Sequence, residues 1–164
     1  MSVFFYDRKD INTDLLFPGK YTYTCATGPE IVEHLLEDLD PEFSRKVQPG
    51  DIIMAGSNFG CGSSREQPSL GLKHVGVQAV VARSFARIFY RNAINIGLPV
   101  IVSDDASKIV KDKDELEIDL DNGKINDLTA QRVFDIPPLP EFIQKVISSG
   151  GYIEYTKAIL AEKK

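Results

Sequence analysis

The chain has 164 residues, of which 43% are hydrophobic and 26% charged, with a formal net charge of −5. This length predicts one domain over residues 1–164, and the composition excludes disorder, collagen and coiled coil. The acidic balance argues against nucleic acid and anionic membranes as partners.

The first part of the chain predicts a strand, a loop and a helix, in that order. Residues 3–6 form the apolar strand, and residues 20–26, which carry no periodicity, form an exposed loop. The helix begins near Thr27, because Thr27 and Glu30 have the spacing of a capping box. Its apolar residues recur every four positions, at Ile31, Leu35 and Leu39.

The middle of the chain predicts three buried strands, at residues 52–55, 79–82 and 100–102. They alternate with a helix around residues 69–74 and with a second helix that Ser84 caps. Gly97 ends this second helix, whose apolar face consists of Phe85, Ile88, Phe89 and Ile96. Nearly continuous apolar strands that alternate with helices indicate a parallel α/β core.

The last third changes to an antiparallel pattern. Leu116, Ile118 and Leu120 alternate with acidic residues, and Asp121-Asn122-Gly123 is typical of a hairpin turn. A proline-rich connector leads to an amphipathic helix that ends at Gly150-Gly151. A polar, frayed tail is expected from about residue 160.

The most unusual segment, residues 56–68, leads from a strand into a helix. It combines glycines, hydroxyls and a guanidinium, namely Gly60, Gly62, Ser63, Ser64 and Arg65. The glycines let backbone N–H groups point into one concavity, and Arg65 can bind a carboxylate through two parallel hydrogen bonds. The same donors would stabilise a serine alkoxide. The alternative interpretation is a tight turn with a solvated arginine, and spacing alone does not decide between the two.

Longer motifs are more specific. Residues 58–66 read NFGCGSSRE and residues 84–99 read SFARIFYRNAINIGLP. Two shorter motifs, Asn12-Thr13-Asp14 and residues 46–51, precede them in the chain. Together they resemble the swivelling domain of the aconitase superfamily, and within it the small subunits of 3-isopropylmalate dehydratase and homoaconitase. The resemblance implies a three-layer β/β/α fold with a mostly parallel core sheet and an antiparallel C-terminal hairpin addition.

The resemblance also implies a role for each motif residue. Ser63 would be the base that removes or returns a substrate proton, and Ser64 and Arg65 would bind a substrate carboxylate. Asp14 would support the site together with Gly60 and Gly62. The implied reaction interconverts 2-isopropylmalate and 3-isopropylmalate by dehydration and rehydration, a step of leucine biosynthesis.

A large subunit that carries a [4Fe–4S] cluster is the partner implied by the resemblance. Two cysteines, Cys25 and Cys61, are too few to hold such a cluster or a secreted disulfide framework. We therefore expect no metal on this chain, and we read Cys61 as a packing residue, with a reactive thiol as the lesser alternative. The N-terminus has no basic leader, which predicts a cytoplasmic protein.

The loop at Thr22 and Tyr23 bears on the choice of substrate. Homoaconitase-like subunits tend to carry an arginine there for a distal carboxylate, whereas this chain has Tyr23 and no Lys or Arg over residues 21–43. A distal substrate carboxylate that was buried at this loop without a cation would cost several kcal/mol. The loop therefore favours a substrate with a small alkyl substituent at that position. Homoaconitase, citramalate and dimethylmalate dehydratases stay open as alternatives, and so does a surface loop that only packs.

Two further interpretations concern a non-enzymatic function and a basic surface. The glycine segment could serve a non-catalytic anion-binding module instead of an enzyme. Arg83, Arg87 and Arg91 are spaced as a basic stripe on one helix face, which is either solvated or docks against an acidic partner surface.

Overall fold

A parallel four-stranded sheet lies at the centre of the computed structural model, which describes residues 1–162. Its strands follow the chain in spatial order: β1 (Val3–Tyr6), β2 (Ile52–Ala55), β3 (Ala79–Ala82) and β4 (Val100–Val102). Each neighbouring pair is parallel, with Ile52 beside Val3 and beside Ala79. The predicted strands are therefore confirmed, together with their parallel arrangement.

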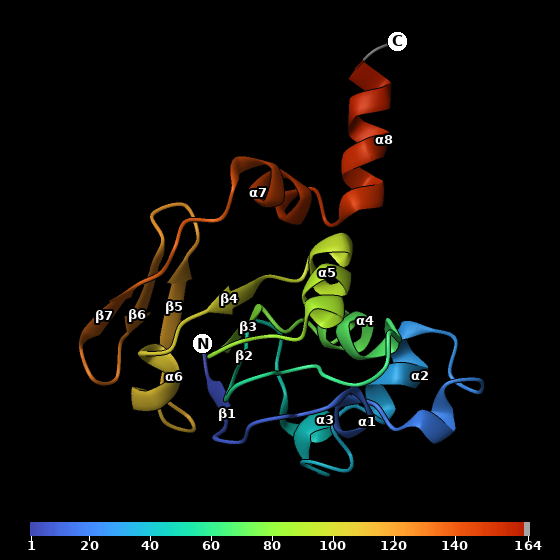
Figure 1. The fold of residues 1–164 in the computed structure, drawn as a ribbon, viewed down its shortest axis with the longest axis horizontal. Coiled ribbons are helices and arrows are strands. Elements are labelled where there is room, and N and C mark those ends of the chain that lie inside the picture. Colours follow the sequence, from blue (N-terminus) through green and yellow to red (C-terminus); the bar gives the residue numbers. More distant parts are fainter. Residues whose placement is uncertain (163–164) are drawn as a thin grey trace.

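A three-stranded antiparallel sheet covers one face of the parallel sheet (Figure 1). It consists of β5 (Leu116–Asp119), β6 (Lys124–Asp127) and β7 (Arg132–Asp135). Because side chains alternate along a strand, Ile52 and Met54 face this sheet and Ile53 faces the helices. The structure is thus layered β/β/α as predicted, and the C-terminal addition is a three-stranded meander.

Eight helices and one 3₁₀ turn accompany the strands within the described residues, and the last two helices follow β7. They are α1 (Thr13–Leu16), η1 (Gly19–Tyr21), α2 (Gly28–Glu33), α3 (Phe43–Lys46), α4 (Gln67–His74), α5 (Arg87–Ile96), α6 (Ala106–Ile109), α7 (Glu141–Ser148) and α8 (Tyr152–Glu162). Helix α4 packs between α2 and α5, and α5 in turn contacts α7 and α8. Helix α8 extends away from the sheets (Figure 1).

The helix predicted from Thr27 is shorter than its periodicity suggests. Glu30 accepts hydrogen bonds from the backbone N–H of Thr27 at 3.0 Å, which confirms the capping interaction, but α2 ends at Glu33. Leu36 has a left-handed φ of +57°, and its N–H donates to the carbonyl of Leu16 at 2.9 Å. Burial of Leu35 and Leu36 in the core outweighs continuation of the helix.

The N-terminal cap predicted for α5 is also wrong. The helix begins at Arg87 after Ala86, whereas the Ser84 hydroxyl accepts a hydrogen bond from the Asn58 N–H at 2.8 Å. Arg83 therefore precedes the helix, and it pairs with Asp7 at 3.1 Å instead of extending a basic stripe. Gly97 ends α5 in the left-handed conformation as predicted.

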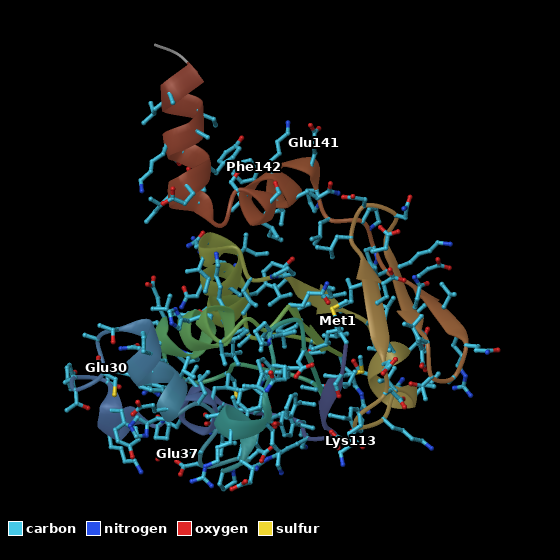
Figure 2. The ribbon with its side chains drawn as sticks, turned by 180° about the vertical axis from the view of Figure 1, so that it is seen from behind. Met1, Glu30, Glu37, Lys113, Glu141 and Phe142 are labelled. Atoms are coloured by element: carbon cyan, nitrogen blue, oxygen red, sulfur yellow. The ribbon has the colours of Figure 1, made fainter. Side chains whose placement is uncertain are left out.

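The C-terminal end differs from the expected tail. Helix α8 continues through residue 160 to Glu162, and the tail prediction for residues 163–164 lies outside the described residues. Phe142 packs edge-on against Tyr152 and Tyr155, which joins α7 to α8, and its ring lies between the two helices in Figure 2. Across residues 1–162, the structure has no helix of the length and apolar character needed to cross a bilayer.

Candidate functional site

Two segments far apart in sequence form the candidate site. The segment after β2 runs beside the N-terminal end of α1, with Asn12 and Cys61 joined as a parallel bridge. The Thr13 N–H donates to the Cys61 carbonyl at 2.7 Å, and the Gly60 N–H donates to the Ile11 carbonyl at 2.8 Å. These backbone contacts fix the Asn12-Thr13-Asp14 motif against the glycine segment.

The two glycines are required by this close packing. Gly60 and Gly62 have φ values of +77° and +107°, a region that side-chain-bearing residues rarely adopt. A Cβ at Gly60 would lie 2.2 Å from Cγ of Phe89, and one at Gly62 would lie 2.9 Å from Oγ1 of Thr13. Their predicted supporting role remains a prediction, and this geometry is consistent with it.

Ser63 lies where these two segments meet. Its N–H donates to Oγ1 of Thr13 at 2.9 Å, and the two hydroxyl oxygens lie 3.1 Å apart. Nε–H of Arg65 donates to Oγ of Ser63 at 2.7 Å. When Thr13 donates its hydroxyl proton, Oγ of Ser63 receives two hydrogen bonds, one of them from a cation. Such donors stabilise the alkoxide and so favour loss of the serine proton.

Arg65 is held from three further directions. Its Nη2 donates to the Asp14 carboxylate at 2.5 Å, and its Nη1 donates to Oγ1 of Thr22 at 3.0 Å and to the carbonyl of Phe17 at 3.3 Å. The Arg65 side chain is 15% exposed, while that of Asp14 is 68% exposed. The structure thus brings together Asp14, Thr22, Ser63 and Arg65, four of the residues predicted for the site.

Ser64 lies next to this network and is exposed to solvent. Its position is fixed through the backbone, since Nδ2 of Asn92 on α5 donates to the Ser64 carbonyl at 3.1 Å and to the Arg65 carbonyl at 3.4 Å. The amide of one helix residue therefore holds two adjacent residues of the glycine segment.

Tyr23 points away from the body of the molecule and is 98% exposed. Together with Thr22 and residues of α4 it lines an open hollow of about 460 Å³. Nε2 of Gln67, the first residue of α4, donates to the Thr22 carbonyl at 3.3 Å. The loop is consequently attached to the first residue of α4, two positions after Arg65.

Thr13 and Asn92 are the functional candidates that sequence reasoning missed. Both lie inside the quoted motifs, Thr13 in Asn12-Thr13-Asp14 and Asn92 in residues 84–99. Thr13 is 1% exposed, and a buried hydroxyl inside a motif is the signal that could have singled it out.

The cysteines do not form a metal centre. Burial and the nearby Asp10 carboxylate raise the pKa of the Cys61 thiol, which keeps it protonated and poorly nucleophilic at neutral pH. Cys25 is buried, and no group of three or more His, Cys, Asp or Glu side chains within residues 1–162 could hold a metal ion. These residues do not fit a [4Fe–4S] cluster, which normally takes three or four thiolates.

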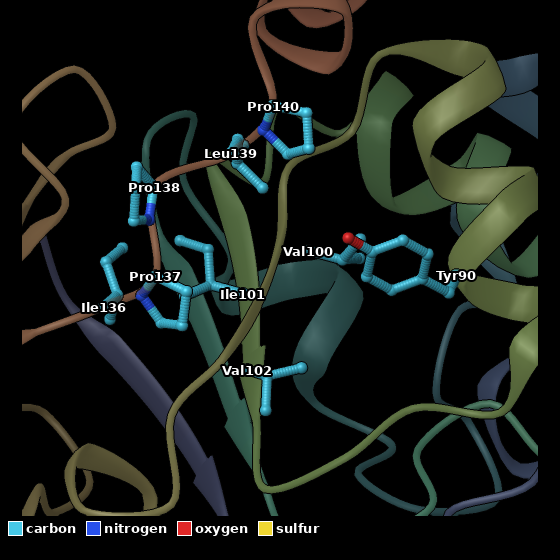
Figure 3. Close-up of a pocket in the computed structure, with 9 residues that line it drawn as sticks. All are labelled: Tyr90, Val100, Ile101, Val102, Ile136, Pro137, Pro138, Leu139 and Pro140. Carbon is cyan, nitrogen blue, oxygen red and sulfur yellow. The ribbon is translucent and has the colours of Figure 1, made fainter.

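A second cavity lies away from this network, between β4 and the proline connector (Figure 3). It measures about 250 Å³ and is lined by aliphatic and proline side chains, with Tyr90 as the one residue carrying a side-chain hydroxyl. It offers no carboxylate, imidazole or guanidinium for proton transfer. The Ser63–Arg65 network is therefore the better candidate for chemistry.

Comparison with known proteins agrees with the fold and identifies the family. Residues 9–105 match the family described as the aconitase C-terminal domain, a span that includes every residue of the Ser63–Arg65 network. The chain belongs to this family.

Its similarities within the family are more specific. It is 47% identical over 152 residues to the 3-isopropylmalate dehydratase small subunit of Ruminiclostridium cellulolyticum, covering 93% of each chain. It is 50% identical over 156 residues to that of Caldicellulosiruptor bescii, covering 95% of this chain and 92% of the other. A crystal structure of 3-isopropylmalate dehydratase from Methanocaldococcus jannaschii superimposes with a TM-score of 0.91 at 37% identity, covering 99% and 97% of the two chains. The chain is thus placed among the 3-isopropylmalate dehydratase small subunits.

Proposed function

We propose that this chain is the small subunit of a hydro-lyase that interconverts 2-isopropylmalate and 3-isopropylmalate in leucine biosynthesis, and that it supplies the base of the reaction. The observation that carries the proposal is the 2.7 Å hydrogen bond from Nε of Arg65 to Oγ of Ser63. A hydroxyl beside a fixed guanidinium ionises more readily than a free serine, because its alkoxide is stabilised, and the alkoxide is the form that accepts a proton.

Ser63 removes the proton from the carbon next to a substrate carboxylate, and the C–O bond of the hydroxyl on the neighbouring carbon breaks. On rehydration the hydroxyl adds to the first carbon and Ser63 returns the proton to the neighbouring one, so that hydrogen and hydroxyl exchange places. Removal of this proton places negative charge on the adjacent carboxylate. Arg65 and Ser64 hold that carboxylate, and the guanidinium offsets the charge as it develops. Asp14 keeps Arg65 oriented through the 2.5 Å contact at Nη2.

Thr22 and Tyr23 face the substituent that distinguishes one substituted malate from another. Thr22 contacts Arg65, so a substrate carboxylate held by Arg65 lies near this loop. The exposed Tyr23 ring offers an uncharged surface suited to an isopropyl group and carries no cation for a third carboxylate.

A large subunit completes the site. Gly62, Ser63 and Ser64 are all exposed in this chain, and covering them against bulk water would strengthen the electrostatic interactions at the reacting atoms. The names of the relatives as small subunits support such a partner. We assign the [4Fe–4S] cluster to that partner, since the cysteines of this chain do not fit it.

Reconstitution tests the proposal. The chain is purified alone and after co-expression with a 3-isopropylmalate dehydratase large subunit, and each sample is assayed with isopropylmalate, citramalate, dimethylmalate and homocitrate. We expect turnover of isopropylmalate only when both chains are present. Carboxylate binding by the isolated chain with no turnover in the complex would instead indicate an anion-binding module.

A further inference from the structure

We propose that Arg87, Ile88 and Arg91 on helix α5 form a docking surface for an acidic patch of the large subunit. The proposal rests on the proposed function, because it names where the partner binds beside Ser63. We call these three residues the α5 face.

The α5 face borders the candidate site directly. Arg87 and Arg91 are one helical turn apart, so their side chains lie on the same side of α5. Both are exposed, and Ile88 between them is 47% exposed. With Gly60 and Gly62 they line an open hollow of about 500 Å³.

The charges of the α5 face are unmatched within the described chain. Arg45, Arg65 and Arg83 each have a carboxylate within 4.0 Å. Neither Arg87 nor Arg91 has one among residues 1–162, although the chain carries five more acidic than basic groups. Arg8 and Arg132 are likewise without one in this range, but Arg87 and Arg91 lie next to each other and beside the candidate site. Two neighbouring arginines without an internal partner provide a local positive surface on an acidic protein, which complements an acidic patch.

The mixed chemistry of the α5 face favours a protein over a free anion. A small dianion would be satisfied by the arginines and would leave Ile88 in contact with charge or water. A protein surface can place carboxylates on the arginines and apolar atoms on Ile88 together. Arginine is also enriched at protein interfaces, and the buried centre of an interface is more apolar than the rest of the surface.

Continuity with Ser63 points to the large subunit as that protein. The partner must cover Gly62 and Ser63 in order to exclude water from the reacting atoms. The hollow that begins at Gly60 and Gly62 ends at Arg87 and Arg91, so a surface that covers the serine extends onto the α5 face.

The test measures the affinity of the full chain for a purified large subunit. The double variant Arg87→Glu/Arg91→Glu replaces two attractive contacts with repulsive ones, and we expect Kd to rise about tenfold or more. The matched control is Arg132→Glu, an exposed arginine on β7 in the other layer, which should leave Kd unchanged. Arg87→Lys/Arg91→Lys keeps the charges and should bind within a few-fold of wild type. Circular dichroism and Tm verify that each variant is folded.

Salt dependence and saturation kinetics separate the alternatives. Higher ionic strength should weaken wild-type binding more than binding of the Glu variant. At saturating large subunit, the Glu variant should recover the wild-type kcat and KM, because these arginines bind the partner and not the substrate. An unchanged Kd, or a raised KM that persists at saturation, overturns the proposal.

Failure of the proposed function has a different signature. If the wild-type complex forms but does not turn over isopropylmalate, the proposed reaction is wrong, and the Kd comparison still decides the docking surface. If the wild-type chain does not bind the large subunit at all, both proposals are overturned.

Discussion

Nε of Arg65 donates a hydrogen bond to Oγ of Ser63, and the other end of the same guanidinium contacts the carboxylate of Asp14. The serine is therefore next to a cation whose orientation is set by this chain alone. Electrostatic stabilisation is effective when the stabilising groups are fixed before the reaction begins. The proposed base thus has its environment in place without the partner and without substrate.

Ser63→Ala should lower kcat of the reconstituted complex by about 10²–10⁴-fold, the usual range for loss of a positioned proton-transfer group. Binding to the large subunit should be retained, because the side chain removed is small and exposed. Ser57→Ala in the same segment is the matched control and should keep normal turnover. A near wild-type kcat for Ser63→Ala would contradict the role of Ser63.

Thr13→Val tests the buried hydroxyl that contacts Ser63. Valine keeps the shape of threonine but removes the acceptor of the Ser63 N–H and the 3.1 Å hydroxyl contact. We expect kcat to fall with little change in KM, and the free energy of unfolding to fall by about 1 kcal/mol. Thr13→Ser restores the oxygen and should recover most of kcat. If Val and Ser variants behave alike, the hydroxyl does not position Ser63.

Tyr23→Arg tests substrate choice. An arginine there offers a planar donor fork to a third carboxylate. Relative kcat/KM should shift about tenfold or more toward homocitrate or homoaconitate and away from isopropylmalate. The comparison is a ratio measured in one reconstituted complex with matched cluster content. Tyr152→Arg, an exposed tyrosine on α8, is the control and should leave the ratio unchanged.

An unchanged ratio in the Tyr23→Arg complex, with both activities intact, would mean that the loop does not contact the distinguishing substituent. The preference for isopropylmalate over homoaconitate substrates would then have no physical basis in this loop.

The isolated chain should contain no iron–sulfur cluster. Only two cysteines are present, one of them buried, and the pKa of the other is raised. Anaerobically purified protein should be colourless and should lack stoichiometric iron and sulfide, measured by metal analysis and visible absorbance. One cluster per chain would contradict the assignment of the cluster to the large subunit.

The sequence was most informative where local pattern and burial agree. The apolar runs at Ile52–Ala55 and Ala79–Ala82 are strands with the expected bounds, because a parallel sheet covered on both faces requires continuous apolar residues. Gly97 similarly ends α5, since its left-handed conformation suits glycine.

The errors occurred where contacts distant in sequence decide the structure. Leu39 fits a helical repeat, yet a hydrogen bond from Leu36 to Leu16 turns the chain before the helix can reach it. The Ser84 hydroxyl has the chemistry of a cap, but Asn58, 26 residues earlier, uses it. Helix α8 was missed because most of its side chains are exposed and it lacks a wide core-facing stripe.

The sequence indicated residues that the structure brings together, but not the hydrogen bonds between them. The motif residues Ser63 and Arg65 are two positions apart in sequence, so their proximity is local. Thr13 lies 50 residues from Ser63, and backbone contacts between their two segments, among them the bridge between Asn12 and Cys61, bring the two hydroxyls together. Patterns within one segment cannot reveal such a pair.

Asn92 attaches the serine turn to helix α5. Its amide holds the carbonyls of Ser64 and Arg65, and it follows Arg91 on the same rigid helix. The serine turn and α5 are therefore held together by this chain itself, so the position of Ser63 relative to Arg87 and Arg91 does not depend on the partner. A large subunit that binds the two arginines as proposed finds the base at a fixed place beside them.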